Sequence, residues 1–266
     1  MSEMLKDFRE LLAEQFDYRE LLFQMTRRDL VLRYKQAAMG FAWAIFMPLV
    51  NTAIFSVIFT RVAKIDVGMP YPLFVFTGLL GWNFFASSLR TAVNSLTSNT
   101  SLVTKVYFPR EIFPFSAVLV SLVDSLVASA VLVAMMAYYG VVPGSAILLL
   151  PVVVAVHLCF TMACSLLLSM ANLFYRDVKY LFEVTIQLWM FATSVLYPVS
   201  LVGGKTAVLM QLNPMTPIID AYRDVLLFNR LPDPAAFGAV ALLSVVGLAW
   251  AWLMFHRAEF QFAENV

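Results

Sequence analysis

Two long runs without an ionisable side chain stand out in the first third of the chain. Residues 37–60 and residues 67–89 contain no Asp, Glu, Lys, Arg or His over 24 and 23 consecutive positions. A helix needs about 20 mainly apolar residues to cross a hydrocarbon layer of about 30 Å. Runs of this length therefore predict membrane-spanning helices and exclude a soluble globular fold.

Apolar segments of this kind recur along the chain and predict an all-α membrane protein with six transmembrane helices. The expected spans are residues 37–63, 70–90, 112–139, 145–173, 179–201 and 235–255. Glycine and proline between the third and fourth spans favour a tight turn, so these two spans are expected to be antiparallel neighbours. The chain then divides into a cytoplasmic N-terminal segment, residues 1–36, and one transmembrane domain, residues 37–266.

The segment between the fifth and sixth spans, residues 202–234, is too polar for a span and too apolar for an ordinary loop. Thr216 followed by Pro217 suits the start of a helix, and residues 218–229 would then form a helix of 12 residues. At 1.5 Å per residue it would be about 18 Å long, too short to cross a membrane. Irregular backbone at membrane depth is tolerated only inside protein or beside a water-filled cavity. This segment is therefore expected to form an outer pair of re-entrant half-helices that gate a pathway.

The N-terminal segment carries a basic, amphipathic pattern just before the first span. Leu21, Leu22, Met25 and Leu32 recur on one helical face, and charged residues, mostly arginines, mark the remaining positions. Such a helix is expected to lie along the cytoplasmic surface of the membrane, in contact with its lipids. The alternative is a positively charged anchor that only fixes the orientation of the first span.

Composition and charge agree with a membrane protein and predict its orientation. The chain is 61% hydrophobic and 13% charged, against roughly 25% charged residues in soluble chains. Of the 18 Lys and Arg residues, 13 fall on the side of the N-terminal segment and five on the opposite side of the six predicted spans. This excess predicts that both termini are cytoplasmic. A net charge of +1 gives no basic field that would favour nucleic acid.

The sequence predicts no catalytic, cofactor or metal site in this chain. Residues 203–206, Gly-Gly-Lys-Thr, resemble the end of a phosphate-binding loop, but Val199 stands where that loop needs its first glycine. The charge count also assigns this segment to the outer side of the membrane. Cys159 and Cys164 lie within an apolar run and are expected to be buried thiols rather than metal ligands.

Asp124 and His157 are ionisable residues deep inside the third and fourth predicted spans. Each lies 12 residues from one end of its span, about 18 Å deep, so the two are expected to approach each other. Ionisable residues at such depth usually face the interior of the bundle. An intramembrane enzyme acting on a lipid-linked glycan would need a larger cluster of such groups, whereas a single pair is typical of a hydrogen bond between helices.

Aromatic residues are abundant in the first and fifth predicted spans. Phe41 and Trp43 in the first span, and Trp189 and Tyr197 in the fifth, are the positions of most interest. Such rings commonly face lipid or form a belt at the membrane interface. Alternatively, they line a pathway, because an aromatic ring can stack on the apolar face of a sugar.

Several short motifs occur together, in order, from about residue 18 to the C-terminus. They resemble motifs of the permeases of type-2 ABC transporters that export polysaccharides, a family that includes exporters of O-antigen, capsule and teichoic acid. The motifs are Arg27-Arg28-Asp29-Leu30, Arg33-Tyr34-Lys35-Gln36, Gly40-Phe41-Ala42-Trp43, Lys105-Val106-Tyr107-Phe108-Pro109-Arg110, Asn172-Leu173-Phe174-Tyr175-Arg176-Asp177-Val178, Asn213-Pro214-Met215-Thr216-Pro217 and Ala221-Tyr222-Arg223-Asp224.

The resemblance implies a half-transporter in the bacterial inner membrane that exports a lipid-linked polysaccharide such as O-antigen. Two copies of the chain would form the channel, and two separate subunits would bind ATP and magnesium. The first and fifth spans would line the channel with Phe41, Trp43, Trp189 and Tyr197. Exporters of small amphiphiles or drugs, and a passive channel without an ATPase, are the alternatives among transport proteins.

The resemblance also implies which segments contact the ATP-binding subunits. They are the N-terminal helix and the loop between the second and third spans, residues 91–110. The cations expected to couple the two subunits are Arg27, Arg28, Lys105 and Arg110.

Overall fold

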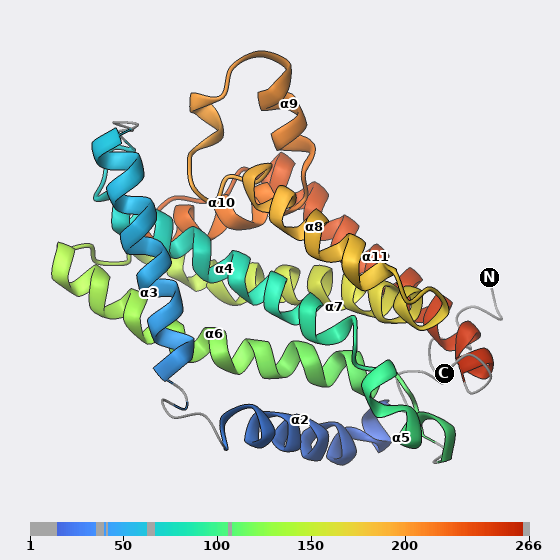
Figure 1. Ribbon diagram of the computed structural model, residues 1–266. Helices are drawn as coiled ribbons and strands as arrows, with labels where there is room; N and C mark the ends of the chain where they lie inside the picture. The colour runs from blue at the N-terminus through green and yellow to red at the C-terminus, as the bar shows by residue number, and fades with distance from the viewer. Residues whose placement is uncertain (1–14, 36–39, 41, 63–66, 106–107, 263–266) are drawn as a thin grey trace.

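The structure is a computed structural model that describes residues 15–35, 40, 42–62, 67–105 and 108–262 (Figure 1). Helices and turns make up these residues, and no strand occurs among them. The α-helices are α2 (Arg19–Tyr34), α3 (Ala42–Val57), α4 (Tyr71–Ala92), α5 (Thr100–Lys105), α6 (Ile112–Tyr139), α7 (Leu150–Phe174), α8 (Val178–Phe191), α9 (Gly204–Leu212), α10 (Met215–Leu226) and α11 (Pro234–Ala258). The shorter elements are the π-helical turn η1 (Ile58–Val62) and the 3-10 turns η2 (Thr97–Asn99), η3 (Ser145–Leu149), η4 (Val199–Leu201) and η5 (Glu259–Gln261).

The apolar pattern predicts most of the long helices to within a few residues. Within the described residues, five helices are long and apolar enough to cross a membrane, namely Ala42–Arg61, Tyr71–Ala92, Ile112–Tyr139, Ser145–Phe174 and Pro234–Gln261. They match the first, second, third, fourth and sixth predicted spans. The end of α6 is predictable because Gly140 follows it with a φ of 70°, a left-handed conformation that glycine adopts without steric cost.

The fifth predicted span, residues 179–201, is not among these five helices. Its helix, α8, ends at Phe191 after 14 residues, a length of about 21 Å. Irregular backbone and the short turn η4 follow, and Thr193 and Ser194 within this stretch are buried. The segment predicted as a full span is thus a shorter helix followed by buried irregular chain.

Helix α4 is the centre of the fold. Almost all of it is buried, and it packs against α3, α6, α7, α8 and α10. Its residues Phe74, Trp82 and Phe85 belong to the largest hydrophobic core. Around it, α11 packs along α7, and α2 packs along α6 (Figure 1).

Contacts between helix termini define two ends of the bundle. At the proximal end, Asn172 near the end of α7 donates a hydrogen bond to the carbonyl of Val93, which follows α4 (2.7 Å). At the same end, Arg110 before α6 pairs with Glu259 after α11. The distal end holds the starts of α4, α7 and α11, the end of α6, and helices α9 and α10 (Figure 1).

Helix α10 begins and ends earlier than the sequence predicts. It starts at Met215 and ends at Leu226, so Thr216 lies inside the helix rather than capping it. The start moves because the side chain of Asn213 accepts a hydrogen bond from the backbone N–H of Met215 (3.1 Å), a contact of the type by which Asn initiates turns. Asn229, expected to be helical, instead has a φ of 48°.

Helix α2 packs along the first half of α6. Met25 is buried in a hydrophobic core that includes the start of α6. Arg33 at the other end of α2 reaches Asp124, 12 residues beyond the start of α6. Leu32, expected on the same apolar face as Met25, is 67% exposed.

Candidate functional site

A partly polar cavity of about 360 Å³ lies between α3, α4, α6 and the end of α2. α3 contributes Trp43 and Asn51 to its lining, and α4 contributes Asn83. α3 lines one side of this cavity. Most of α3 is nevertheless accessible, since Pro48 and Thr52 are its only buried residues. Polar groups gathered between otherwise apolar helices are typical of a substrate or ion pathway.

Arg33, Tyr34 and Asp124 lie together in the lining of this cavity and attach α2 to α6. Arg33 Nη1 pairs with Asp124 Oδ2, and the Tyr34 hydroxyl donates a hydrogen bond to Asp124 Oδ1. Arg33 Nη2 also donates to Thr91 Oγ1 at 3.0 Å. Burial, together with the hydrogen bond to Asp124, raises the pKa of Tyr34 to about 12, so the phenol remains a donor at physiological pH. These charge-assisted bonds compensate the Asp124 carboxylate inside the bundle.

The predicted pair of Asp124 and His157 does not form. His157 is buried, its Nδ1 lies 3.3 Å from the Tyr222 hydroxyl, and its ring packs edge-on against Phe84 with centroids 4.9 Å apart. Asp124 is bonded to Arg33 instead. The prediction was wrong because it considered the two spans alone. Helix α2 brings Arg33 to Asp124, and a guanidinium is a stronger partner for a carboxylate than an imidazole.

Of the two first-span aromatic residues expected to line the channel, the structure describes only Trp43. Phe41 lies outside the described residues. Trp43 is 41% exposed, lines the polar cavity, and packs edge-on against Phe46 with centroids 5.8 Å apart. Part of its ring face is therefore accessible to another molecule.

The other two aromatic residues expected to line the channel are Trp189 in α8 and Tyr197 in the segment after it. Both form hydrogen bonds within the chain. The ring of Trp189 packs edge-on against Phe85 with centroids 5.2 Å apart, and its Nε1 donates to Asn213 Oδ1 at 2.8 Å. The Tyr197 hydroxyl donates to the carbonyl of Phe191 at 2.5 Å. Both side chains thus hold α8 and the segment after it in position.

The two segments expected to contact ATP-binding subunits touch each other at the proximal end. Arg28 Nη2 in α2 donates to Asn99 Oδ1 in the loop between α4 and α6 at 3.2 Å. Arg28 also pairs with Asp29 at 2.8 Å. Arg27 and Lys105 are exposed. The helix and the loop therefore form one continuous surface that carries free cationic positions.

Arg110, expected to be a coupling cation, points into the chain. Its side chain is 13% exposed and pairs through Nη1 with Glu259 Oε1 at 3.2 Å. Its Nη2 donates to the Val103 carbonyl in α5 at 3.1 Å. Arg110 therefore ties α5 to the end of α11.

A buried arginine at the distal end escapes prediction from the sequence. The charge count treats Arg223 as a cation on the outer side of the membrane, yet it is 2% exposed. It donates to the carbonyls of Ser194, of Val195 at 2.6 Å and of Phe74 at 3.3 Å, and its guanidinium stacks 3.6 Å over the ring centroid of Phe74. It also pairs with Asp220 at 3.3 Å. The sequence signals of this cluster are the motif that contains Arg223 and the i, i+3 spacing of Asp220 and Arg223, and neither indicates burial.

Comparisons with known proteins show which sequences this chain resembles. The family model described as ABC-2 type transporter matches residues 20–227, from the first turn of α2 to the end of α10. A Myxococcus xanthus protein named O-antigen export system permease protein RfbA is 32% identical over 258 residues, which cover 96% of this chain and 99% of that protein. Two Klebsiella pneumoniae proteins of the same name are 30% and 29% identical over 249 residues, covering 92% of this chain and 94% of theirs.

These matches confirm the resemblance to type-2 ABC permeases that the sequence motifs indicate. The family model covers well over half of the chain, and the relatives align over almost its whole length. The chain therefore belongs to the ABC-2 type transporter family.

Proposed function

We propose that this chain is the transmembrane subunit of an ATP-driven exporter of O-antigen, a lipid-linked polysaccharide, in the bacterial inner membrane. The observation that carries the proposal is the alignment of three O-antigen export permeases over 92% to 96% of the chain. In this proposal two copies form the channel, and two separate ATP-binding subunits hold ATP and magnesium. The chain is a transporter subunit rather than an enzyme.

The proposed topology has six crossings and two cytoplasmic termini. The backbone N–H of Lys179, at the start of α8, donates to Asn172 Oδ1 at the proximal end (3.3 Å). Val195, just after α8, is bonded to Arg223 near the start of α4 at the distal end. These contacts support a crossing by α8 and the irregular chain that follows it. The proximal end, where α11 also ends, is the cytoplasmic end in this proposal because the charge excess lies there.

The proposed outer gate is the segment that contains α9 and α10. Tyr222 of α10 reaches His157, seven residues beyond the start of α7, and the space beside Gly81 of α4 is filled by Ile219. Arg223 donates hydrogen bonds to the buried carbonyls of Ser194 and Val195, which follow α8. Both features support a half-helix that enters the bundle, where irregular backbone must find partners within the protein.

The proposed pathway runs along α3 and α8. Each packs against α4 on one side and leaves much of its surface uncovered: Phe46, Ile54 and Val57 of α3 are at least 46% exposed, as are Leu181 and Leu188 of α8. A second copy of the chain, lipid or polymer would cover these faces. Trp43 beside the polar cavity is the stacking position that this proposal assigns to the polysaccharide.

Export in cells tests the proposal directly. Cells that lack this chain should accumulate lipid-linked polysaccharide inside and display none at the surface. The wild-type chain should restore display together with its ATP-binding partner, but not with a partner that cannot hydrolyse ATP. If surface polysaccharide is unchanged by loss of the chain while efflux of a small amphiphile falls, the substrate assignment is wrong. Restored display with the inactive partner would contradict ATP-driven export.

A further inference from the structure

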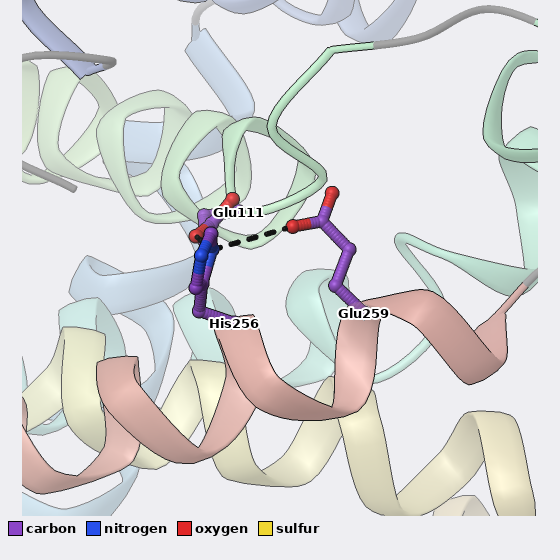
Figure 2. Close-up of side chains that lie close together, drawn as sticks. All are labelled: Glu111, His256 and Glu259. Atoms are coloured by element: carbon purple, nitrogen blue, oxygen red, sulfur yellow. Dashed lines mark ion pairs between the residues drawn. The ribbon is translucent and has the colours of Figure 1, made fainter. Parts of the chain in front are cut away.

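Three side chains that can bind a metal ion meet at the proximal end of the bundle (Figure 2). Glu111 precedes α6, His256 lies in the last turn of α11, and Glu259 begins η5. One ligand atom from each lies within 4.8 Å of the others. His256 Nδ1 is 3.7 Å from Glu111 Oε1 and 3.5 Å from Glu259 Oε2. The cluster joins parts of the chain that are about 145 residues apart, so it exists only in the folded protein.

Glu111 is the unusual member of this cluster because it is completely buried. Its exposed fraction is 0%, and its Oε1 accepts a hydrogen bond from Trp252 Nε1 at 3.2 Å. Its Oε2 is buried as well and has no hydrogen-bond partner among the described residues. A buried carboxylate with one oxygen unpaired is strongly disfavoured unless a cation compensates its charge.

Arg110 neutralises Glu259, the other carboxylate of the cluster. Its backbone N–H and its Nη1 donate to Glu259 Oε1 at 3.1 Å and 3.2 Å, and Nη1 also donates to the Glu259 carbonyl. This arrangement occupies Oε1 of Glu259 and leaves Oε2 directed at His256, as Figure 2 shows. Arg110 thus compensates Glu259, whereas Oε1 of Glu111 accepts its hydrogen bond from the neutral indole of Trp252.

We infer that Glu111, His256 and Glu259 bind a divalent transition-metal ion, with Zn²⁺ as the best fit. An imidazole nitrogen and two carboxylate oxygens are ligands that zinc accepts, whereas magnesium and calcium prefer oxygen alone. Zinc bonds of about 2.0–2.2 Å in tetrahedral geometry put ligand atoms about 3.3 Å apart. The separations of 3.5 Å and 3.7 Å at His256 Nδ1 need only a small inward movement.

The site is accessible and compensates the charge of both glutamates. The His256 side chain is 30% exposed, which opens a path for the ion and leaves room for water as a fourth ligand. The ion compensates the buried carboxylate of Glu111 and joins the end of α11 to the start of α6. Through Arg110 and the Val103 carbonyl it also fixes α5. Only this last consequence, a metal-held coupling loop, rests on the proposed function, whereas ion binding does not.

Metal binding to the purified full-length chain tests the inference. The chain is prepared without a polyhistidine tag, stripped with chelator, and titrated with ZnCl₂ by calorimetry. We expect one ion per chain, a higher melting temperature with zinc, and at least tenfold weaker binding in Glu111→Gln and in His256→Gln. Glu183→Gln, which removes an exposed carboxylate on α8, is the matched control and should bind zinc as the wild type does.

Any of three results would count against the inference. The first is a stripped wild-type chain that neither binds zinc stoichiometrically nor gains melting temperature, as expected if a protonated His256 alone holds the two carboxylates. The second is unchanged affinity in both variants. Because a variant can fail to fold, Co²⁺ is added to the wild type as an independent probe, and absence of tetrahedral cobalt absorption bands also counts against the site. Normal zinc binding with failed polysaccharide export would leave the site intact and contradict the proposed function instead.

Discussion

The buried guanidinium of Arg223 explains how irregular chain is tolerated after α8. Buried backbone carbonyls outside a helix must find hydrogen-bond donors within the protein. Arg223 donates to the carbonyls of Ser194 and Val195 and stacks on Phe74. There is room for it only because residue 78 of α4 is glycine. A Cβ at Gly78 would lie 2.4 Å from Arg223 Nη2 and 2.7 Å from the carbonyl oxygen of Val195.

Gly78→Ala is therefore expected to destabilise the protein. Overfilling a packed site costs roughly 1–3 kcal/mol, and here displacement of Arg223 would also break its hydrogen bonds to backbone. The control is Gly247→Ala in α11, where a Cβ meets nothing within 4 Å and where alanine favours the helix by about 0.5–1 kcal/mol. Thermal unfolding in detergent should show a loss for the first variant and none for the second. Equal melting temperatures for the two variants would refute this account of Gly78.

Asp124 and Arg33 are expected to stabilise the docking of α2 on α6. Their side chains are 19% and 29% exposed, so the pair is partly shielded from water. A hydrogen bond to a charged group contributes roughly 1.5–3 kcal/mol, and Asp124→Asn should loosen α2 by an amount in or below this range. Hydrogen exchange in α2 should rise in this variant and stay unchanged in Asp17→Asn, which alters an exposed carboxylate before α2. A double-mutant cycle with Arg33→Gln that gives no coupling energy would rule out the pair as the cause.

At the scale of elements, the sequence predicts helices well where the apolar run ends in a strong local signal. The bounds of α6 follow from charged residues before it and Gly140 after it. The prediction for α8 is too long because residues 192–198 carry no charged side chain, and hydropathy does not distinguish a helix from buried irregular chain. The decisive information is Arg223, which is close in space and distant in sequence. For the same reason the sequence does not predict the contact between Glu111 and His256. These residues are distant in sequence and meet only when the start of α6 packs near the end of α11.

The loop between α4 and α6 gives a prediction at this scale that distinguishes two of its cations, Lys105 and Arg110. Lys105 is exposed at the end of α5, whereas Arg110 is tied to Glu259 and to the Val103 carbonyl. Lys105→Glu should keep the fold and weaken assembly with the ATP-binding subunit. Arg110→Glu should instead lower the melting temperature, because it leaves Glu259 facing a like charge.

Co-purification and thermal unfolding measure the two effects separately. Lys205→Glu is the matched control, since Lys205 is an exposed cation on α9 at the distal end. It should affect neither property. Normal assembly in Lys105→Glu, or loss of assembly in Lys205→Glu, would place the contact elsewhere.

At the scale of the whole molecule, α3 and α8 each expose apolar side chains that no other described part of this chain covers. α4 holds both helices from one side, so a partner can approach from the other side without disturbing the core. Trp189 and Trp43, both expected from the sequence to line the channel, differ in how accessible their rings are. Trp189 is packed on Phe85 and bonded to Asn213, whereas Trp43 has an accessible ring beside the polar cavity. Leucine at Trp189 should therefore lower stability, and its effect on export would carry no information about the pathway.

Trp43→Leu is the informative variant for the pathway. Leucine is as apolar as tryptophan toward lipid but has no flat face on which a sugar ring can stack, so export should fall several-fold while membrane insertion and assembly with the ATP-binding subunit persist. The matched control is Trp250→Leu in α11, because Trp250 is 56% exposed and lines none of the described cavities. Polysaccharide at the cell surface, measured per assembled transporter, separates the two. Equal export in both variants would mean that Trp43 faces lipid and that the polymer crosses the membrane along another surface of the molecule.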